Sequence, residues 1–185
     1  MNYQEQAHVN MLSFCSDEKF AEKKAFLMYL AQTFNKREVR WCLTCSSTLF
    51  FRGIATDFHD FDVLIDYQDI SKALGVVKEL NPQNLPKGDQ TLFASTLFNK
   101  YKVGSVHFDL FSEWRISNMF DFEYSWREED NEEFDIEGVT IKMVSARVQY
   151  ILYSVFSPWY VRRLEQAAAV AEYLQDSSNV GSLMQ

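Results

Sequence analysis

Three carboxylates, Asp60, Asp62 and Asp109, are the side chains in this sequence best suited to chemistry. Asp60 and Asp62 are two residues apart, and on an extended backbone that spacing puts both side chains on the same face. Carboxylate oxygens are hard ligands for divalent cations such as Mg²⁺. Three carboxylates held together repel one another unless cations lie between them. If Asp109 lies on a neighbouring strand, the three residues form a metal site suited to phosphates.

A second group of residues could receive a phosphate tail. Ser46 and Ser47 are small hydroxyl residues at the start of a helix-forming segment, where backbone N–H groups favour anions. Arg52 could also reach a phosphate, although a solvated helix end explains it equally well. His59 and His107 stand beside the carboxylates, and histidines in that setting are more often hydrogen-bond partners than ligands.

These residues need a particular set of elements to position them. Residues 39–44 predict a short strand, followed by a tight turn at Ser46-Ser47 and a helix that ends at Gly53. Residues 60–66 alternate acidic and apolar side chains and predict a second strand. Residues 69–80 have helical spacing. Residues 92–98 and 102–111 predict two strands joined by a hairpin turn at 99–101, with Asp109 in the second strand.

The flanking segments complete the prediction. Residues 17–35 carry apolar side chains three and four apart, which predicts an amphipathic helix. Residues 134–143 alternate around Gly138 and predict a hairpin. From Ser145 the chain turns helical, with a break at Ser157-Pro158 and a final helix through Tyr173. We interpret Arg162 and Arg163 on that helix as part of a solvated face.

Length and composition limit the class of protein. With 185 residues, 47% of them hydrophobic, the chain has the size of one domain with a substantial core. It contains no run of about 18 apolar residues, so a membrane span is excluded. Three cysteines are too few for a disulfide framework, and with no apolar leader we expect a cytoplasmic protein. Cys42 and Cys45 lack the partners of a zinc site, so we expect buried thiols.

The acidic charge is concentrated in one segment. The chain has a net charge of −8, but residues 121–137 alone contain nine acidic residues and one basic residue. The remainder is balanced, so we interpret the segment as a solvated loop or a docking surface for a basic partner. A long nucleic-acid track is disfavoured, whereas a phosphate-bearing ligand in the core is not.

The ordered motifs resemble the nucleotidyltransferase superfamily, and within it the small antibiotic and minimal nucleotidyltransferases. The family signature is a small pair, Gly-Gly or Gly-Ser, then 9 to 13 residues, then Asp-x-Asp or Asp-x-Glu, with a third carboxylate on a later strand. Here 12 residues separate Ser47 from Asp60. Trp41, before the small pair, and His59, before the acidic pair, fit the family pattern loosely. The likeness covers residues 37–111 well and residues 133–175 only in outline.

The resemblance implies an α+β fold, a mixed β-sheet flanked by helices with a C-terminal helical region. We expect a nucleotidyltransferase-like core over residues 1–118, then an acidic segment, hairpin and helices over residues 119–185. The resemblance implies that Asp60 and Asp62 bind Mg²⁺ and that Asp109 is a further ligand or the base. Ser46 and Ser47 would hold the β- and γ-phosphates, and Arg52 is assigned with them to nucleotide binding.

The implied reaction transfers a nucleoside monophosphate from an NTP, with ATP expected, to a hydroxyl of a small molecule or protein. One departure matters: the family's first small residue is Gly, which lets phosphates approach closely, and this chain has Ser46. The alternative is therefore a weak or inactive binding module, such as an antitoxin-like partner. A metal-dependent phosphohydrolase ranks lower because the acids precede the apolar strand. We leave a homodimer open as the oligomeric state.

Overall fold

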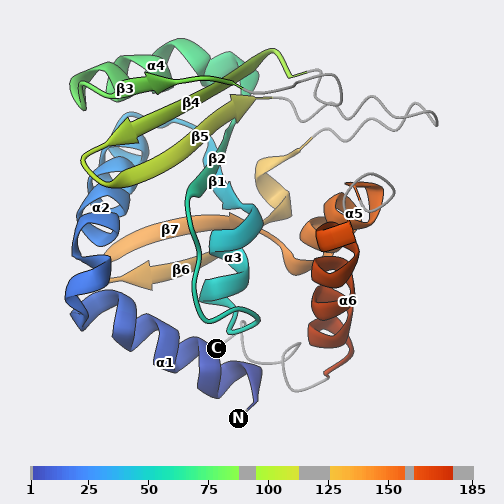
Figure 1. The fold of residues 1–185 in the computed structure, drawn as a ribbon. Helices are drawn as coiled ribbons and strands as arrows, with labels where there is room; N and C mark the ends of the chain where they lie inside the picture. Colours follow the sequence, from blue (N-terminus) through green and yellow to red (C-terminus); the bar gives the residue numbers. More distant parts are fainter. Residues whose placement is uncertain (1, 88–94, 113–125, 157–160, 177–185) are drawn as a thin grey trace.

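The computed structural model of the chain describes residues 2–87, 95–112, 126–156 and 161–176 (Figure 1). Its helices are α1 (Tyr3–Ser16), α2 (Ala21–Lys36), α3 (Cys45–Phe51), α4 (Ile70–Glu79), α5 (Ala146–Phe156) and α6 (Val161–Gln175). Its strands are β1 (Trp41–Thr44), β2 (Phe61–Ile65), β3 (Gln83–Leu85), β4 (Leu97–Val103), β5 (Val106–Ser112), β6 (Asn131–Ile136) and β7 (Val139–Val144). Among the described helices, none combines the length and apolar character needed to cross a membrane.

The described strands form one mixed sheet in the order β3-β4-β5-β2-β1-β7-β6. At its centre β2 runs antiparallel to β1 and parallel to β5, and β1 runs parallel to β7. The hairpins β4–β5 and β6–β7 extend the sheet on either side. The α+β class and the mixed sheet are confirmed. The expected boundary at residues 118 and 119 lies outside the described residues, and β7 from the later segment pairs directly with β1.

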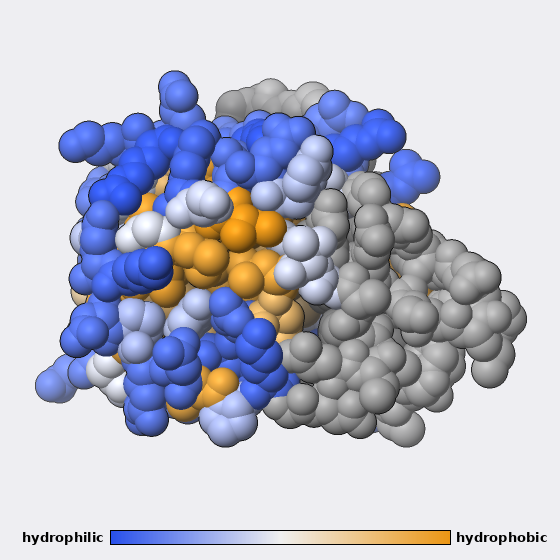
Figure 2. Space-filling model, turned by 90° about the horizontal axis from the view of Figure 1, so that it is seen from above, coloured by the Kyte–Doolittle hydropathy of each residue, from blue (hydrophilic) through white to orange (hydrophobic). Residues whose placement is uncertain are grey.

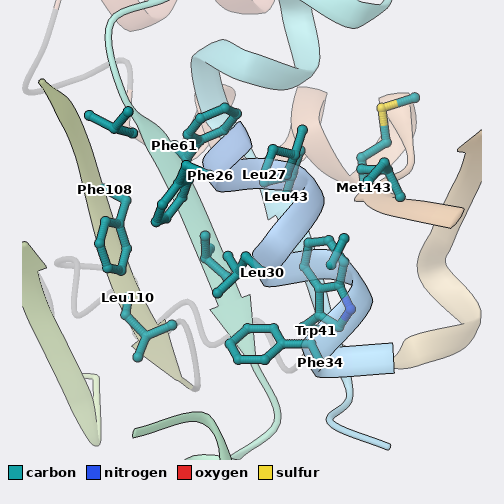
Figure 3. Close-up of a cluster of buried hydrophobic side chains, with 14 of the residues drawn as sticks. Phe26, Leu27, Leu30, Phe34, Trp41, Leu43, Phe61, Phe108, Leu110 and Met143 are labelled. Atoms are coloured by element: carbon teal, nitrogen blue, oxygen red, sulfur yellow. The ribbon is translucent and has the colours of Figure 1, made fainter. Parts of the chain in front are cut away.

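One face of the sheet is covered by α2 (Figure 1). Because side chains alternate along a strand, Phe61, Val63 and Ile65 all point to this face and are fully buried. They belong to one core cluster with α2 side chains spaced three and four residues apart, and the close-up in Figure 3 shows Phe61 beside Phe26 of that helix. These α2 residues are Phe26, Leu27, Leu30 and Phe34. Truncation of such a buried phenylalanine to alanine costs about 3–5 kcal/mol, so this interface holds the sheet in place.

The opposite face carries α5 and α6 over part of its area (Figure 1). Leu64 and Phe111 on the strands pack there with Val148 and Leu152 of α5. The same alternation puts Asp62, Lys100 and Lys102 of β4, and His107 and Asp109 of β5 on this face, which is therefore the one that carries the chemistry. On the side seen in Figure 2, from above, polar side chains surround an apolar area.

Helix α1 has no counterpart in the sequence prediction. Asn10 is buried and donates from Nδ2 to the carbonyl oxygens of Phe50, at 2.6 Å, and Ala55, at 2.8 Å. Gly53 has a positive φ of 71°, and a Cβ there would clash with the Tyr3 carbonyl and lie 2.5 Å from the Ala7 nitrogen. The glycine therefore lets α1 pack directly on the loop between α3 and β2.

The predicted hairpin turn at residues 99–101 is wrong. Strand β4 continues to Val103, and the turn falls at Gly104 and Ser105, where Gly104 has a φ of 58°. The alternation of side chains in the next strand is confirmed, with Phe108 towards the core and Asp109 on the opposite face. The shift moves Lys100 from a turn to mid-strand, opposite Asp109. Residues 92–94 and the break at 157–158 lie outside the described residues.

Candidate active site

The carboxylates of Asp62 and Asp109 come from directly paired positions of parallel strands. Asp62 on β2 is the register partner of Asp109 on β5, and on its other side it faces Thr44 at the end of β1. Asp60 lies two residues earlier, just before β2 begins. Asp109 is buried, with 7% of its surface exposed, and Asp60 and Asp62 are partly buried. The structure thus brings the three predicted carboxylates to one part of the sheet.

The electrostatics of this site favour an added cation. Burial raises the pKa of Asp62 well above its ordinary value, and repulsion from Asp60 and Asp109 raises it further. Arg163 and Lys100 act in the opposite direction but do not reverse the shift. Burial also raises the pKa of Asp109, against the lowering effect of Lys100. A bound divalent cation would relieve this repulsion.

The carboxylates are not arranged as a finished metal cluster. Lys100 Nζ donates to Asp109 Oδ2 in a short ion pair. Within the described ranges, no group of three or more His, Cys, Asp or Glu side chains is set to hold a metal ion. The donor chemistry, oxygen only, fits Mg²⁺. Asp60 and Asp62 are therefore the pair suited to hold it, while Asp109 is occupied by Lys100.

The turn between β1 and α3 has its unusual backbone at Cys45. Cys45 has a φ of 58°, in the left-handed region that favours glycine. Its N–H donates to Gln149 Oε1 of α5 at 2.9 Å, and Thr44 Oγ1 donates to the same oxygen at 3.1 Å. Gln149 is fully buried, so α5 fixes the shape of this turn. The position that needs a glycine-like backbone is Cys45, one residue before the predicted pair.

The two serines of the turn differ in surroundings. Ser47 is fully buried and donates to the Thr44 carbonyl at 3.2 Å. Ser46 is less buried as a residue, but its hydroxyl oxygen is itself buried and has no hydrogen-bond partner among the described residues. Ser46 is thus the serine with a hydroxyl to offer a ligand, whereas Ser47 closes the turn. With Cys45-Ser46 as the small pair, 13 residues precede Asp60, still within the family spacing.

Arg52 lies away from the carboxylates. Its guanidinium donates to Glu132 at 2.7 Å and to the Val144 carbonyl oxygen, and its side chain is 2% exposed. Glu132 also accepts from the Ala146 N–H at 3.1 Å. Arg52 therefore connects the end of α3 to β6 and β7, and through Glu132 to α5. In this arrangement its guanidinium does not point to the nucleotide-binding turn to which the sequence assigned it. Glu132 belongs to the acidic segment, so part of that charge is structural.

Sequence reasoning missed Arg163, which α6 brings towards the carboxylates. Its guanidinium lies 5.1 Å from the Tyr153 ring centroid and donates to Gln166 at 2.8 Å. Burial lowers the pKa of Arg163, but the fields of Cys45, Tyr153, Asp62 and Asp60 raise it overall. The arginine was interpreted as part of a solvated face because only the α5–α6 packing shows which way it points. No local pattern in the sequence could have identified it.

The buried thiols and the paired histidines complete the site. Cys42 and Cys45 are free and buried, as predicted, and burial raises the pKa of both thiols well above the ordinary value. His59 and His107 lie with ring centroids 5.4 Å apart and an interplanar angle of 32°. His107 lies on β5 and His59 just before β2, so the pair bridges the two elements that carry the carboxylates.

Comparison with known families finds no match, and comparison with curated proteins finds no similar sequence. Solved structures are similar in fold. A putative nucleotidyltransferase from Thermotoga maritima has a TM-score of 0.59 at 17% identity, covering 84% of this chain and 94% of that one. ANT(2'')-Ia in complex with adenylyl-2''-tobramycin gives 0.57 at 10% identity, covering 84% and 91%. The lincosamide adenylyltransferase LnuA, lincomycin-bound, gives 0.53 at 13%, covering 82% and 96%.

These similarities establish the class of fold. The mixed sheet, the helices on its two faces and the strand-turn-helix before the acidic strand form a nucleotidyltransferase-like fold. The resemblance found in the sequence is confirmed at that level.

Proposed function

We propose that this protein is a nucleotidyltransferase that moves a nucleoside monophosphate from an NTP, with ATP expected, to a hydroxyl acceptor. The observation that carries the proposal is the pairing of Asp62 with Asp109 on parallel strands, with Asp60 two residues before Asp62. The fold of the similar structures supports it. The acceptor is a small molecule or a protein side chain, and the expected compartment is the cytoplasm.

Asp60 and Asp62 would hold Mg²⁺, which supplies positive charge that neutralises the triphosphate and the developing negative charge. Ser46 offers its hydroxyl to the phosphates from the adjacent turn. The acceptor oxygen attacks the α-phosphorus, the bond from that phosphorus to the pyrophosphate oxygen breaks, and pyrophosphate leaves. Asp109 would take the proton of the acceptor hydroxyl. Arg163 adds a positive charge beside Asp60 and Asp62.

A second candidate is a binding module with this fold and little or no turnover. The ion pair between Lys100 and Asp109 favours it, because it neutralises the third carboxylate without a metal. The positive φ of Cys45 favours it as well, because it stands where a glycine would let phosphates approach the backbone closely. In that case the protein would act through a partner.

Pyrophosphate release separates the two candidates. The full chain is incubated with each NTP in turn and Mg²⁺, with and without EDTA, together with the variants Asp60→Asn and Glu129→Gln. Glu129 is a matched carboxylate control, because its side chain is 74% exposed and pairs only with Arg127 among the described contacts. We expect Mg²⁺-dependent release that Asp60→Asn lowers at least about 100-fold and Glu129→Gln leaves unchanged. Release unaffected by Asp60→Asn, or absent from wild type with every NTP, contradicts the transferase.

A further inference from the structure

Strand β4 adds two lysines to the face that carries the carboxylates. Lys100 is the register partner of Asp109, and Lys102 is the register partner of His107. Tyr101 between them points to the opposite face, where it is 6% exposed and stacks on Phe108 with ring centroids 5.1 Å apart. Because side chains alternate along a strand, Lys100 and Lys102 both lie on the carboxylate face.

Two histidines border the same area. His107 lies beside Lys102 across the β4–β5 ladder, and its ring contacts that of His59, which is exposed. Imidazole rings offer N–H donors whichever tautomer is present. Lys100 and Lys102 together with His59 and His107 are named here the β4–β5 subsite. All four present hydrogen-bond donors.

Negative and positive side chains occupy different parts of this face of the sheet. Asp60 and Asp62 stand on the β2 side, next to the turn at Ser46, whereas the lysines stand on β4. Asp109 on β5 lies between the two groups and is bound by Lys100. On the proposed function, the nucleotide occupies the β1–β2 side. The acceptor hydroxyl must reach Asp109, so the body of the acceptor lies over β4 and β5.

We infer that the β4–β5 subsite accepts a hydroxyl compound carrying an anionic group, a phosphate or a carboxylate, and disfavours polycationic acceptors. This inference rests on the proposed function and names its acceptor class. The anion is held by Lys102 and the histidines, with Lys100 orienting Asp109 beside it. The inference distinguishes this chain from ANT(2'')-Ia, whose structure holds adenylyl-2''-tobramycin, since tobramycin carries several amino groups that the lysines would repel.

The test is a binding experiment on the full chain with matched probes. Isothermal titration calorimetry is run with D-glucose 6-phosphate, D-glucuronate, D-glucose and tobramycin. Each titration is done with and without saturating Mg²⁺ and a non-hydrolysable ATP analogue, so that the probes cannot bind in place of the nucleotide phosphates. We expect one or both anionic sugars to bind at least about tenfold more tightly than glucose or tobramycin. The two anionic probes tell a phosphate ligand from a carboxylate ligand.

Substitutions of Lys102 test whether the anionic probe binds at the β4–β5 subsite. Lys102→Met should weaken the anionic probe about three- to tenfold, the range for one partly exposed charged contact. Lys102→Glu should reverse the order of affinities, so that tobramycin binds more tightly than the anionic probe. Lys36→Met, an exposed lysine on α2 away from this face, is the matched control and should change nothing. Far-UV circular dichroism confirms that each variant is folded.

The outcomes distinguish the inference from the proposed function. If the ATP analogue binds with Mg²⁺ but no anionic probe binds better than glucose, the inference is wrong and the proposed function stands. An equal loss of affinity for the anionic probe in Lys102→Met and Lys36→Met also contradicts the inference. If the analogue does not bind but Lys102→Met alone weakens the anionic probe, the subsite is real and the proposed function fails.

Discussion

Asp62 and Asp109 face each other directly across two parallel strands, β2 and β5, and each is buried enough to have a raised pKa. A purely structural sheet gains little from two such carboxylates side by side, because Lys100 pairs with Asp109 alone and the pKa of Asp62 stays raised. The pairing is therefore the strongest sign in the molecule that this face binds something positively charged.

The pH dependence of the unfolding free energy should report the ionisation of Asp69, which lies in the turn after β2. Burial would raise its pKa, but hydrogen bonds from the Arg40 backbone, Lys72 and the Arg40 guanidinium lower the pKa to about 2. Because the folded pKa lies below the unfolded one, this stabilisation is present above about pH 4 and is lost as the pH falls towards 2. Arg40 and Lys72 are partly exposed, so the contribution is about 1–2 kcal/mol.

Urea unfolding of wild type and Asp69→Asn at pH 5 and pH 2.5 measures this contribution. Other carboxylates titrate equally in both proteins, so the difference isolates Asp69. Wild type should lose more stability than the variant on acidification. Parallel losses in the two proteins would mean that Asp69 does not contribute.

Gly53→Ala should separate α1 from the domain. The new methyl group meets the backbone of Tyr3 and Ala7 and also requires a positive φ, so we expect a loss of about 2–4 kcal/mol in unfolding free energy. Gly75→Ala on α4 is the control, since a Cβ there has nothing within 4 Å. That variant should gain about 0.5–1 kcal/mol from helix propensity. Equal effects in thermal denaturation would refute the close packing of α1.

Arg52→Met tests whether this arginine is structural. Its buried guanidinium donates hydrogen bonds to Glu132 and to the Val144 carbonyl oxygen. The substitution should therefore lower the free energy of unfolding by about 3 kcal/mol. The exposed pair of Arg127 and Glu129 provides the control, and Arg127→Met should change stability by less than about 1 kcal/mol. Chemical denaturation gives both values. A stable Arg52→Met protein with weakened nucleotide binding would instead support the phosphate role assigned from the sequence.

Cys45→Gly tests which residue occupies the glycine position of the turn. Glycine relieves a positive φ worth about 1 kcal/mol and lets the backbone of the turn come closer to a bound phosphate. We expect calorimetry to show that a Mg²⁺-bound ATP analogue binds about two- to tenfold more tightly, which corresponds to roughly 1 kcal/mol. Ser46→Gly should not improve binding, because it deletes the hydroxyl and relieves no strain. The reverse result would place the small pair at Ser46-Ser47.

Much of this fold could be predicted because its signals are local. The spacing of apolar residues in α2 and α4, and the alternation of side chains in β2, β5 and the β6–β7 hairpin, follow directly from residue order. Asp60 and Asp62 were found for the same reason. Helix α1 was missed because the contacts that hold it, from Asn10 and against Gly53, involve residues 40 or more positions apart.

The rest of the site depends on contacts that residue order does not reveal. The turn was predicted at residues 99–101, between the two predicted strands, whereas Gly104 with its positive φ makes the turn. That single shift decides whether Lys100 meets Asp109. Gln149 and Arg163 reach the site from α5 and α6, roughly 100 residues after the turn they approach, so only tertiary packing places them.

Mg²⁺-dependent nucleotide binding by wild type and Asp62→Asn is the most direct test of the central claim. The full chain is titrated with a non-hydrolysable ATP analogue in the presence of Mg²⁺ and again in EDTA, and thermal denaturation confirms that the variant is folded. The account predicts binding that requires Mg²⁺ and is lost in Asp62→Asn, while the variant is at least as stable as wild type because a repelling charge is gone. Binding that is indifferent to both Mg²⁺ and Asp62→Asn would contradict it.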